Sequence, residues 1–465
     1  MMRGAALAVL CGGVVSCSIL SGASELTVGG GEGPIAGQDL DASAKFEGGA
    51  VADAPADGVG PSPDAKTGPP AGSVDTTFGV GGRVLINFGA SEAGHDMTIG
   101  PDGSIVVGGR TGSGIPTNFA VARLTAKGDL DPTFGNGGKV TLDFVSDYDE
   151  VNGLARQSDG LYVAAGRCWS PPNGGFLVAA ARFDASGVLD PSYGAGGRVQ
   201  AGVANTNNQD GTFALVLRPG DAPVVAGSQN GNVALTAFLA NGSLDPTPGG
   251  AVTGAPGVVR SLARQSDGKL VLAGYTTAYT SATSTDVIVE RRNVDLSLDP
   301  SFGVGGRATV NIGVFDHAYA VAIMPSGAIV VAGDTGAVSG SEDVLVLRFD
   351  VNGALDGTFG QGGHVITPVG PGSSDRARAV AIDGSGRIVV AGSTTAGKDQ
   401  DVLLLRYDTK GALDPTFGNK GVVSPAAAGS DEARDLGFTA DGRIVIVGTG
   451  ANAVDSDMLV QRFWP

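Results

Sequence analysis

Short apolar runs alternate with turn residues along the chain between Val74 and Pro465. The unit that starts at Asp316 contains the runs AYAVAIM, AIVVAGD, DVLVLRF and HVITPV, each six or seven residues long. Runs of this length, rich in Val, Ile and Leu and closed by Gly, Asp, Asn or Pro, predict β-strands, and no segment carries a helical period. An SG or DG pair between the first two runs predicts a tight hairpin, because glycine accepts positive φ.

One phrase recurs in every unit. LDPTFGNGGKV, which begins at Leu130, returns in forms such as LDPSFGVGGRA and LDPTFGNKGVV. Its aspartates lie 54 to 59 residues apart, at Asp75, Asp131, Asp190, Asp245, Asp299, Asp356 and Asp414. This period indicates one supersecondary unit stacked many times, and seven units of four strands predict an all-β, seven-bladed β-propeller of four-stranded antiparallel blades. A β-solenoid, with coils of about 20 to 30 residues, is the alternative.

The two ends of the repeat region complement each other. The last unit stops after its third strand, Asp457–Phe463, and the first begins with a fourth-strand sequence, GGRVLINF. We therefore expect Arg83–Phe88 to pair with Asp457–Phe463, because this pairing closes the ring and removes an exposed sheet edge.

The repeated residues resemble a known family. DGKLVLAG (Asp267–Gly274) and DGRIVIVG (Asp441–Gly448), each followed by arginine and the LD-x-[ST]-F phrase in most units, are similar to the delta-60 repeat, a bacterial β-propeller repeat of unknown function. The resemblance implies the propeller fold and no catalytic residues. The third unit departs most, since Pro248 replaces the aromatic residue and Ala237 the arginine.

The N-terminus has the features of a targeting signal. A short basic start precedes thirteen small or apolar residues, 4–16, which are too few to span a bilayer comfortably. Val14-Val15-Ser16-Cys17 resembles the bacterial lipobox, so we expect residues 1–16 to be a lipoprotein signal peptide and Cys17 to carry the lipid. Ser18 is not aspartate, which favours the outer membrane of the bacterial cell envelope as the destination. The alternative is an ordinary secretory signal with an incidental cysteine.

Residues 17–73 are rich in Gly, Ala, Pro and Asp and nearly lack aromatic side chains. Such a segment cannot bury enough apolar surface to offset its ordering entropy, so it predicts a disordered tether. Its end-to-end distance would be on the order of 40 Å. An alternative is that part of it wraps the propeller, which we expect to span residues 74–465.

The amino-acid composition limits the classes of molecule that this chain could bind. The chain has 30 Lys and Arg against 47 Asp and Glu, a net charge of −17, which argues against nucleic acid because phosphate binding needs basic stripes. An acidic surface keeps a repeat-built β protein soluble, and we expect a monomeric head. Cys168 is the one cysteine outside the N-terminal signal region, so it has no internal disulfide partner. It is expected to be a small, partly buried apolar residue, with a nucleophilic thiol as the alternative.

An acidic residue precedes the innermost strand of six units. These candidate binding residues are Glu92, Asp149, Asp210, Asp316, Asp375 and Asp431, with Gly257 in the fourth unit. At one mouth of a propeller channel they would form a carboxylate ring able to bind a cation or a basic peptide. The alternative is that each carboxylate caps its own turn through backbone N–H groups.

Two further columns are expected to join neighbouring blades. The first contains an arginine near the end of the third strand, which we expect to pair with the LD aspartate or with a carbonyl of the neighbouring blade. It comprises Arg123, Arg182, Arg291, Arg348, Arg406 and Arg462. The second contains the ring of the LDPTFG phrase and comprises Phe78, Phe134, Tyr193, Phe302, Phe359 and Phe417.

No catalytic motif or metal-ligand spacing occurs, and no cofactor is predicted. The three histidines, His95, His317 and His364, lie in different units, and strand alternation does not suggest several arginines on the channel face. Variable loops on a rigid frame favour a binding or adhesion module, tethered to the membrane, with an unknown protein or glycan partner. The alternatives are a scaffold of the cell envelope or a propeller enzyme acting on a sugar or a quinone-linked substrate.

Overall fold

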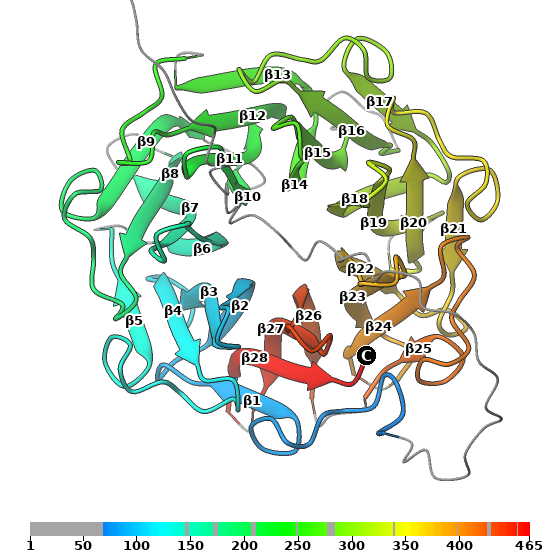
Figure 1. The fold of residues 1–465 in the computed structure, drawn as a ribbon, viewed down its shortest axis with the longest axis horizontal. Helices are drawn as coiled ribbons and strands as arrows, with labels where there is room; N and C mark the ends of the chain where they lie inside the picture. The colour runs from blue at the N-terminus through cyan, green and yellow to red at the C-terminus, as the bar shows by residue number, and fades with distance from the viewer. Residues whose placement is uncertain are drawn as a thin grey trace, which may run out of the picture. The chain divides into compact units, whose positions relative to one another are not determined.

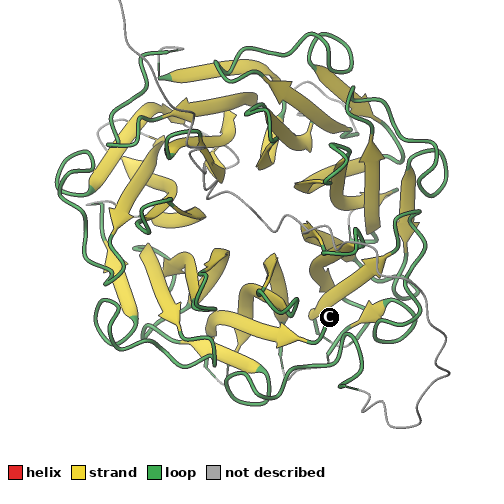
Figure 2. Cartoon of the chain, in the orientation of Figure 1, coloured by secondary structure: helices red, strands yellow, loops and turns green. Residues whose placement is uncertain are grey.

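The computed structural model describes residues 68–465 except 145–147, 171–174, 206–210, 248–249, 277–283, 338–339, 398, 426–428 and 453. The predicted signal peptide, Cys17, most of the predicted tether and Asp210 lie outside the described residues. The described part consists of strands and loops without helices (Figure 2), and therefore contains no helix that could cross a membrane.

The strands form seven four-stranded antiparallel sheets arranged as blades around a common axis (Figure 1). Blade 1 contains β2 (Glu92–Ile99), β3 (Ile105–Thr111), β4 (Asn118–Leu124) and β5 (Lys139–Leu142). Blade 2 contains β6 (Asp149–Arg156), β7 (Tyr162–Ser170), β8 (Gly175–Phe183) and β9 (Arg198–Asn205). Blade 3 contains β10 (Gly211–Arg218), β11 (Ala222–Gln229), β12 (Asn232–Ala237) and β13 (Ala251–Pro256).

Four further blades complete the ring. Blade 4 contains β14 (Val258–Arg264), β15 (Leu270–Tyr275), β16 (Val287–Arg292) and β17 (Arg307–Val310). Blade 5 contains β18 (Phe315–Ile323), β19 (Ile329–Gly336), β20 (Asp343–Phe349) and β21 (His364–Thr367). Blade 6 contains β22 (Asp375–Ile382), β23 (Ile388–Thr394), β24 (Asp401–Tyr407) and β25 (Val422–Val423). Blade 7 contains β26 (Asp431–Phe438), β27 (Ile444–Ala451), β28 (Ser456–Phe463) and, from the other end of the chain, β1 (Arg83–Ile86).

The ring is closed as the sequence predicts. β1 pairs antiparallel with β28, from Arg83 opposite Gln461 to Ile86 opposite Met458. The pairing ends at Ile86, two residues short of the expected strand end at Phe88. The first and last segments of the described chain therefore share one sheet.

The propeller begins slightly before the predicted boundary at Val74. The Gly72 N–H donates to the Trp464 carbonyl at 2.8 Å, and the Ala71 carbonyl accepts from the Gly418 N–H at 2.9 Å. Ala71 also packs against the apolar cluster between blades 6 and 7. The last residues assigned to the tether thus belong to the folded head, because they complete hydrogen bonds at the closure.

The hydrophobic core lies between the blades. Each cluster joins two neighbouring sheets; Phe359, for example, leaves blade 5 and packs among Val380 and Leu403 of blade 6. The six repeated rings are fully buried in this way, as the sequence predicts: Phe78, Phe134, Tyr193, Phe302, Phe359 and Phe417. Burying a side chain of this size contributes about 1.5–3 kcal/mol, so these rings are a main source of blade-to-blade cohesion.

Alternation of strand direction gives the ring two different faces. The hairpins between first and second strands, and the loops between third and fourth strands that carry the LDPTFG phrase, lie on one face, here called the repeat face. The loops between second and third strands and those leading from one blade to the next lie on the other, here called the variable face. The innermost strand of each blade begins at the variable face and borders the ring axis (Figure 1).

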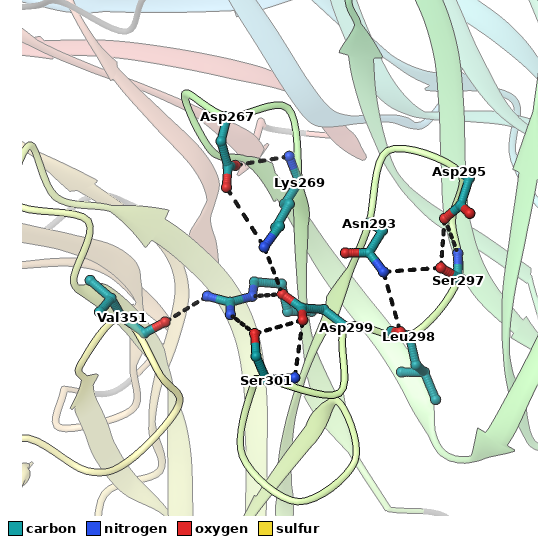
Figure 3. Close-up of polar contacts among 10 residues, drawn as sticks. Asp267, Lys269, Asn293, Asp295, Ser297, Leu298, Asp299, Ser301 and Val351 are labelled. Atoms are coloured by element: carbon teal, nitrogen blue, oxygen red, sulfur yellow. Dashed lines mark hydrogen bonds and ion pairs between the residues drawn. The ribbon is translucent and has the colours of Figure 1, made fainter.

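The arginine column joins the blades on the repeat face. Arg291 donates from Nε to Asp299 Oδ2 at 2.7 Å and from Nη1 to the Val351 carbonyl of the next blade at 2.5 Å. Asp299 also accepts hydrogen bonds from Ser301 and from Lys269 Nζ, and these groups converge in Figure 3. Four other arginines pair with both their aspartate and the next blade's carbonyl: Arg123, Arg182, Arg348 and Arg462. The predicted blade-joining role is confirmed.

The third unit compensates for its missing arginine. Ala237 occupies the arginine position, but Arg218, at the end of β10 in the same blade, reaches Asp245 Oδ2 at 2.6 Å. A different strand thus supplies the cation, and the aspartate keeps its partner.

Candidate functional site

The predicted acidic column is buried. Asp316 is 0% exposed, and its carboxylate accepts hydrogen bonds from the Ile312 N–H at 2.6 Å and from Thr335 Oγ1 at 2.5 Å. Asp375 makes the equivalent contacts, with the Val369 N–H at 2.8 Å and with Thr394 Oγ1. Each carboxylate therefore fastens the loop that enters its blade.

The other described members of the column behave similarly. Glu92 accepts from the Ala90 N–H and from Thr111, Asp149 accepts from the Phe144 N–H, and Asp431 accepts from the Ala451 N–H and Arg83. Burial raises the pKa of both Glu92 and Asp431. These are the contacts of turn-capping groups, and a binding role for the column stays a prediction.

A β-bulge interrupts the innermost strand of every blade at the same place. In blade 5 the pairing of β18 with β19 shifts between Ala318 and Ala320, so Tyr319 is the extra residue. We call the seven extra residues the bulge set: His95, Asn152, Phe213, Arg260, Tyr319, Arg378 and Arg434. Because a bulge twists the strand and re-aims one side chain, it separates these residues from the regular alternation.

A glycine in the second strand makes room for the bulge. A Cβ on Gly333 would lie 1.8 Å from the His317 carbonyl oxygen, which no side chain tolerates. Five other glycines meet the same obstacle at 1.8 or 1.9 Å: Gly109, Gly166, Gly274, Gly392 and Gly448. The repeated glycine that ends runs such as IVVAG is therefore the sequence signal of the bulge.

Members of the bulge set meet across blade boundaries. Each innermost strand contacts those of both neighbouring blades. The Arg260 guanidinium lies 4.0 Å from the centre of the Phe213 ring, and the Arg378 guanidinium lies 4.2 Å from the centre of the Tyr319 ring. Such cation–π contacts hold an arginine in place without neutralising its charge.

Blades 1 and 2 contribute a buried acid and a neutral histidine. Glu150 accepts from Arg167 at 2.8 Å and from the Tyr148 hydroxyl at 2.8 Å. Burial alone would raise the pKa of Glu150, but Arg167 and Tyr148 outweigh it and lower the pKa to about 2. His95 Nδ1 lies 2.8 Å from the Val151 carbonyl, and burial together with the Arg434 guanidinium lowers the pKa of His95 to about 4. His95 is therefore uncharged at neutral pH.

Blades 4 and 5 bring a histidine and two tyrosines into mutual contact. His317 Nδ1 lies 2.7 Å from Asp334 Oδ1, and Nε2 lies 3.2 Å from Thr285 Oγ1. The ring centres of Tyr275 and Tyr319 are 4.6 and 5.9 Å from that of His317. The buried Asp334 thus orients an imidazole whose second nitrogen faces a hydroxyl.

Blades 6 and 7 add paired charges beside the bulge set. Arg376 donates to Glu342 at 3.2 Å, and Arg434 pairs with Glu432 at 2.5 Å. Burial alone would raise the pKa of Glu342, but the Ser374 hydroxyl and Arg376 lower it to about 2. The side chain of Arg434 is 41% exposed, which leaves its guanidinium open to a ligand.

Strand alternation did not suggest several arginines on the channel face, yet the innermost strands that border the axis contain several. Arg260, Arg376, Arg378 and Arg434 all lie on these strands. Assigning every second side chain to the same face of the strand fails there, because the bulge adds one residue and shifts the alternation of the side chains that follow. The missed signal was a single variable position between two small residues, as in AYA of blade 5 and ARA of blade 6.

The structure also bears on a metal site and on a reactive thiol. Among the described residues, no group of three or more His, Cys, Asp or Glu side chains is placed to hold a metal ion. Cys168 is fully buried, and burial raises the pKa of its thiol to about 12, so it is protonated and packs as an apolar residue. His364 lies on the outermost strand of blade 5, away from the bulge set.

Sequence comparison gives one family match. Residues 100–134, 265–302, 325–359 and 384–417 match the family described as "Domain of unknown function (DUF5122) beta-propeller". No curated protein sequence matches this chain.

Several solved structures are similar in fold. The polysaccharide lyase Uly1 is 10% identical, with a TM-score of 0.44 over 80% of this chain and 89% of the lyase. Drosophila Plexin A, in complex with Semaphorin 1b, is 9% identical, with a TM-score of 0.45 over 84% and 88%. The Staphylococcus aureus virginiamycin B lyase is 10% identical, with a TM-score of 0.42 over 81% and 97%. Such identities carry no information on function, whereas the family match and the seven-bladed ring together support a β-propeller family for this chain.

Proposed function

We propose that this chain is a binding module whose ligand contacts the bulge set on the innermost strands. One observation carries the proposal: the blades repeat the residues that join them, whereas the seven bulge positions hold five types of side chain. A position that serves only the frame would tolerate the same residue in each blade, as the repeat-face arginine does. Bulges that re-aim side chains are common next to binding and active sites.

The charge of the bulge set favours an anionic ligand. It contains three arginines, of which Arg434 pairs with Glu432, and no carboxylate, within a chain of net charge −17. A local positive site on an acidic molecule attracts a ligand with few negative charges, whereas the overall charge repels long polyanions such as nucleic acid. This differs from the cation or basic peptide that the acidic column suggested.

The proposal is tested on a glycan and peptide array with the purified chain. We expect ligands bound by the wild type to be lost in a His95→Ala, Tyr319→Ala, Arg434→Ala triple variant. A control variant, Val80→Ala with Val304→Ala, changes two repeat-face side chains that are each 90% exposed, and it should bind normally. Binding that survives the first variant and disappears in the second would refute the proposal. A chain that binds no ligand would instead favour the scaffold alternative.

A second candidate, an enzyme acting on a sugar, is favoured by the His317–Asp334 pair. A carboxylate at 2.7 Å from Nδ1 is the arrangement of an oriented general base, and the rings of Tyr275 and Tyr319 lie beside the imidazole. Incubation with polysaccharides and assay of newly formed chain ends would test it. Turnover that is abolished by His317→Ala and by Asp334→Asn would establish an enzyme in place of a pure binding module.

Attachment to the outer membrane through lipidated Cys17 belongs to the same proposal and rests on the lipobox-like sequence. A tethered head would present its binding face to ligands at the envelope. Cys17→Ala should release the chain from the membrane fraction or leave an uncleaved precursor. Palmitate labelling that persists in this variant would contradict the assignment.

A further inference from the structure

Two arginines of the bulge set form no ion pair within the part of the chain that the structure describes. These are Arg260 and Arg378, whereas three arginines of other blade positions are paired: Arg167, Arg376 and Arg434. Arg260 donates to the Tyr275 hydroxyl at 2.7 Å, and its Nε is buried without a hydrogen-bond acceptor in the described part of the chain. An unsatisfied guanidinium donor in a native structure calls for a missing partner.

Aromatic rings hold both arginines in place. Phe213 and Tyr275 lie 4.0 and 5.5 Å from the Arg260 guanidinium, and Tyr319 lies 4.2 Å from that of Arg378. Stacking fixes the planar groups without forming an ion pair, although the charge of Arg378 still acts on Glu432. Little side-chain conformational entropy is therefore lost when a ligand binds. The two arginines are therefore preorganised for an anion.

Tyr319 stands between the two arginines. It belongs to blade 5, whereas Arg260 and Arg378 belong to blades 4 and 6, and both guanidiniums act electrostatically on its hydroxyl. Burial and the nearby Asp334 raise the pKa of Tyr319 to about 12, so the hydroxyl keeps its proton and can donate a hydrogen bond. Tyr319 therefore lies within electrostatic range of one arginine from each neighbouring blade.

The surroundings narrow the anion to one on a hydroxyl-rich ligand. A guanidinium fork matches a carboxylate with two parallel hydrogen bonds. Asp334 Oδ2 is buried without a hydrogen-bond donor among the described residues, and Arg376 Nε lies 3.7 Å from it. Tyr275 and Tyr319 supply flat rings with polar edges. Carboxylates, hydroxyls and flat apolar faces occur together in sugar acids.

We propose that Arg260, Tyr319 and Arg378 bind the carboxylate groups of an acidic oligosaccharide of uronic acid type. This rests on the proposed function, in which the bulge set contacts the ligand. The hydroxyls of Tyr275 and Tyr319 contact the sugar hydroxyls in the same site.

The test is calorimetric titration of the purified chain with galacturonate, mannuronate and glucuronate oligomers. Each is compared with the same oligomer after reduction of its carboxyl groups to alcohols. We expect at least one acidic oligomer to bind and its reduced form to bind far more weakly. Arg260→Gln and Arg378→Gln keep side-chain length and should each weaken binding about ten- to a hundredfold, the loss of a hydrogen bond to a charged group. Affinity should also fall with added salt.

Controls separate this inference from the proposed function. Arg156→Gln changes an arginine at the opposite, hairpin end of an innermost strand and should leave affinity unchanged. Arg378→Lys keeps the charge but not the fork, and should give an intermediate loss. Equal binding of acidic and reduced oligomers, no binding of any acidic oligomer, or tighter binding of poly-glutamate would overturn the carboxylate-sugar assignment. If a different ligand is then lost in the His95, Tyr319 and Arg434 triple variant, the proposed function stands without it; if none is, both fall.

Discussion

The repeat face and the axis side of the ring are built from the same blades but differ in how their arginines are paired. On the repeat face Arg406 is almost fully buried, pairs with Asp414 at 2.9 Å and stacks on Phe417, and its counterparts do the same in other blades. On the axis side Arg378 stacks on Tyr319 without an acidic partner among the described residues. Neutralised arginines hold blades together, whereas an uncompensated arginine is available to something outside the chain.

The largest effect should come from breaking the ring itself. Deletion of residues 68–88 removes β1 and Asp75, which pairs with Arg462 at 2.7 Å. It exposes the edge of β28 and leaves a buried arginine unpaired, so we expect loss of the folded monomer and aggregation. Size-exclusion chromatography and circular dichroism would detect this. Deletion of residues 1–67 is the control and should leave the melting temperature unchanged. A monomer with normal melting after the first deletion would show that closure contributes little.

A matched pair of arginine variants tests the contrast between the faces directly. Arg406→Ala removes the buried partner of Asp414 and leaves Arg387, at 3.4 Å, as its remaining cation. It should lower the free energy of unfolding by up to about 3–5 kcal/mol. Arg378→Ala removes one cation–π contact and should cost less than about 1 kcal/mol. Urea unfolding measures both. Equal costs would mean that the axis-side arginine is also a structural group.

The acidic column should respond to hydrogen bonding more than to charge. Asp316→Ala leaves the Ile312 and Gly313 N–H groups without an acceptor and should cost about 1–3 kcal/mol. Asp316→Asn can still accept from these groups and donate to Thr335, so we expect a cost below about 1 kcal/mol. Thermal melts of the two variants distinguish them. A large loss in the Asn variant would show that the negative charge itself is needed.

The smallest expected effect is on how the stability of the fold changes in acid. Hydrogen bonds from Thr358 and the charge of Arg348 lower the pKa of Asp356, so its contribution is present above its unfolded value of 3.8 and is lost as pH falls through the lowered pKa. Burial raises the pKa of Glu92, so protonation favours the folded state as pH falls toward 4.5. Asp356→Asn should therefore flatten the loss of stability in acid, whereas Glu92→Gln should steepen it. Melting temperatures at pH 7, 5 and 3 would reveal either pattern, and parallel curves would contradict both.

The amino-acid sequence determined the frame of this protein. The period of 54 to 59 residues, the LD phrase and the missing fourth strand of the last unit were sufficient for seven blades and their closure. Local patterns suffice because every blade packs against its neighbours through the same contacts, so the same residues recur in each repeat. The role of the arginine column could be predicted for the same reason.

Only the tertiary structure decided which side chains meet at the axis. Arg260, Tyr319 and Arg378 are 59 residues apart in sequence, one per blade, and nothing in a single repeat marks them as neighbours. The bulge shifts the alternation by one residue, which moves these side chains away from where counting places them. For the acidic column the sequence did identify the residues but not their role. A repeated carboxylate is compatible both with a buried turn-capping group and with an exposed carboxylate ring. Burial and partners depend on the neighbouring blade, and the sequence of one blade does not contain that information.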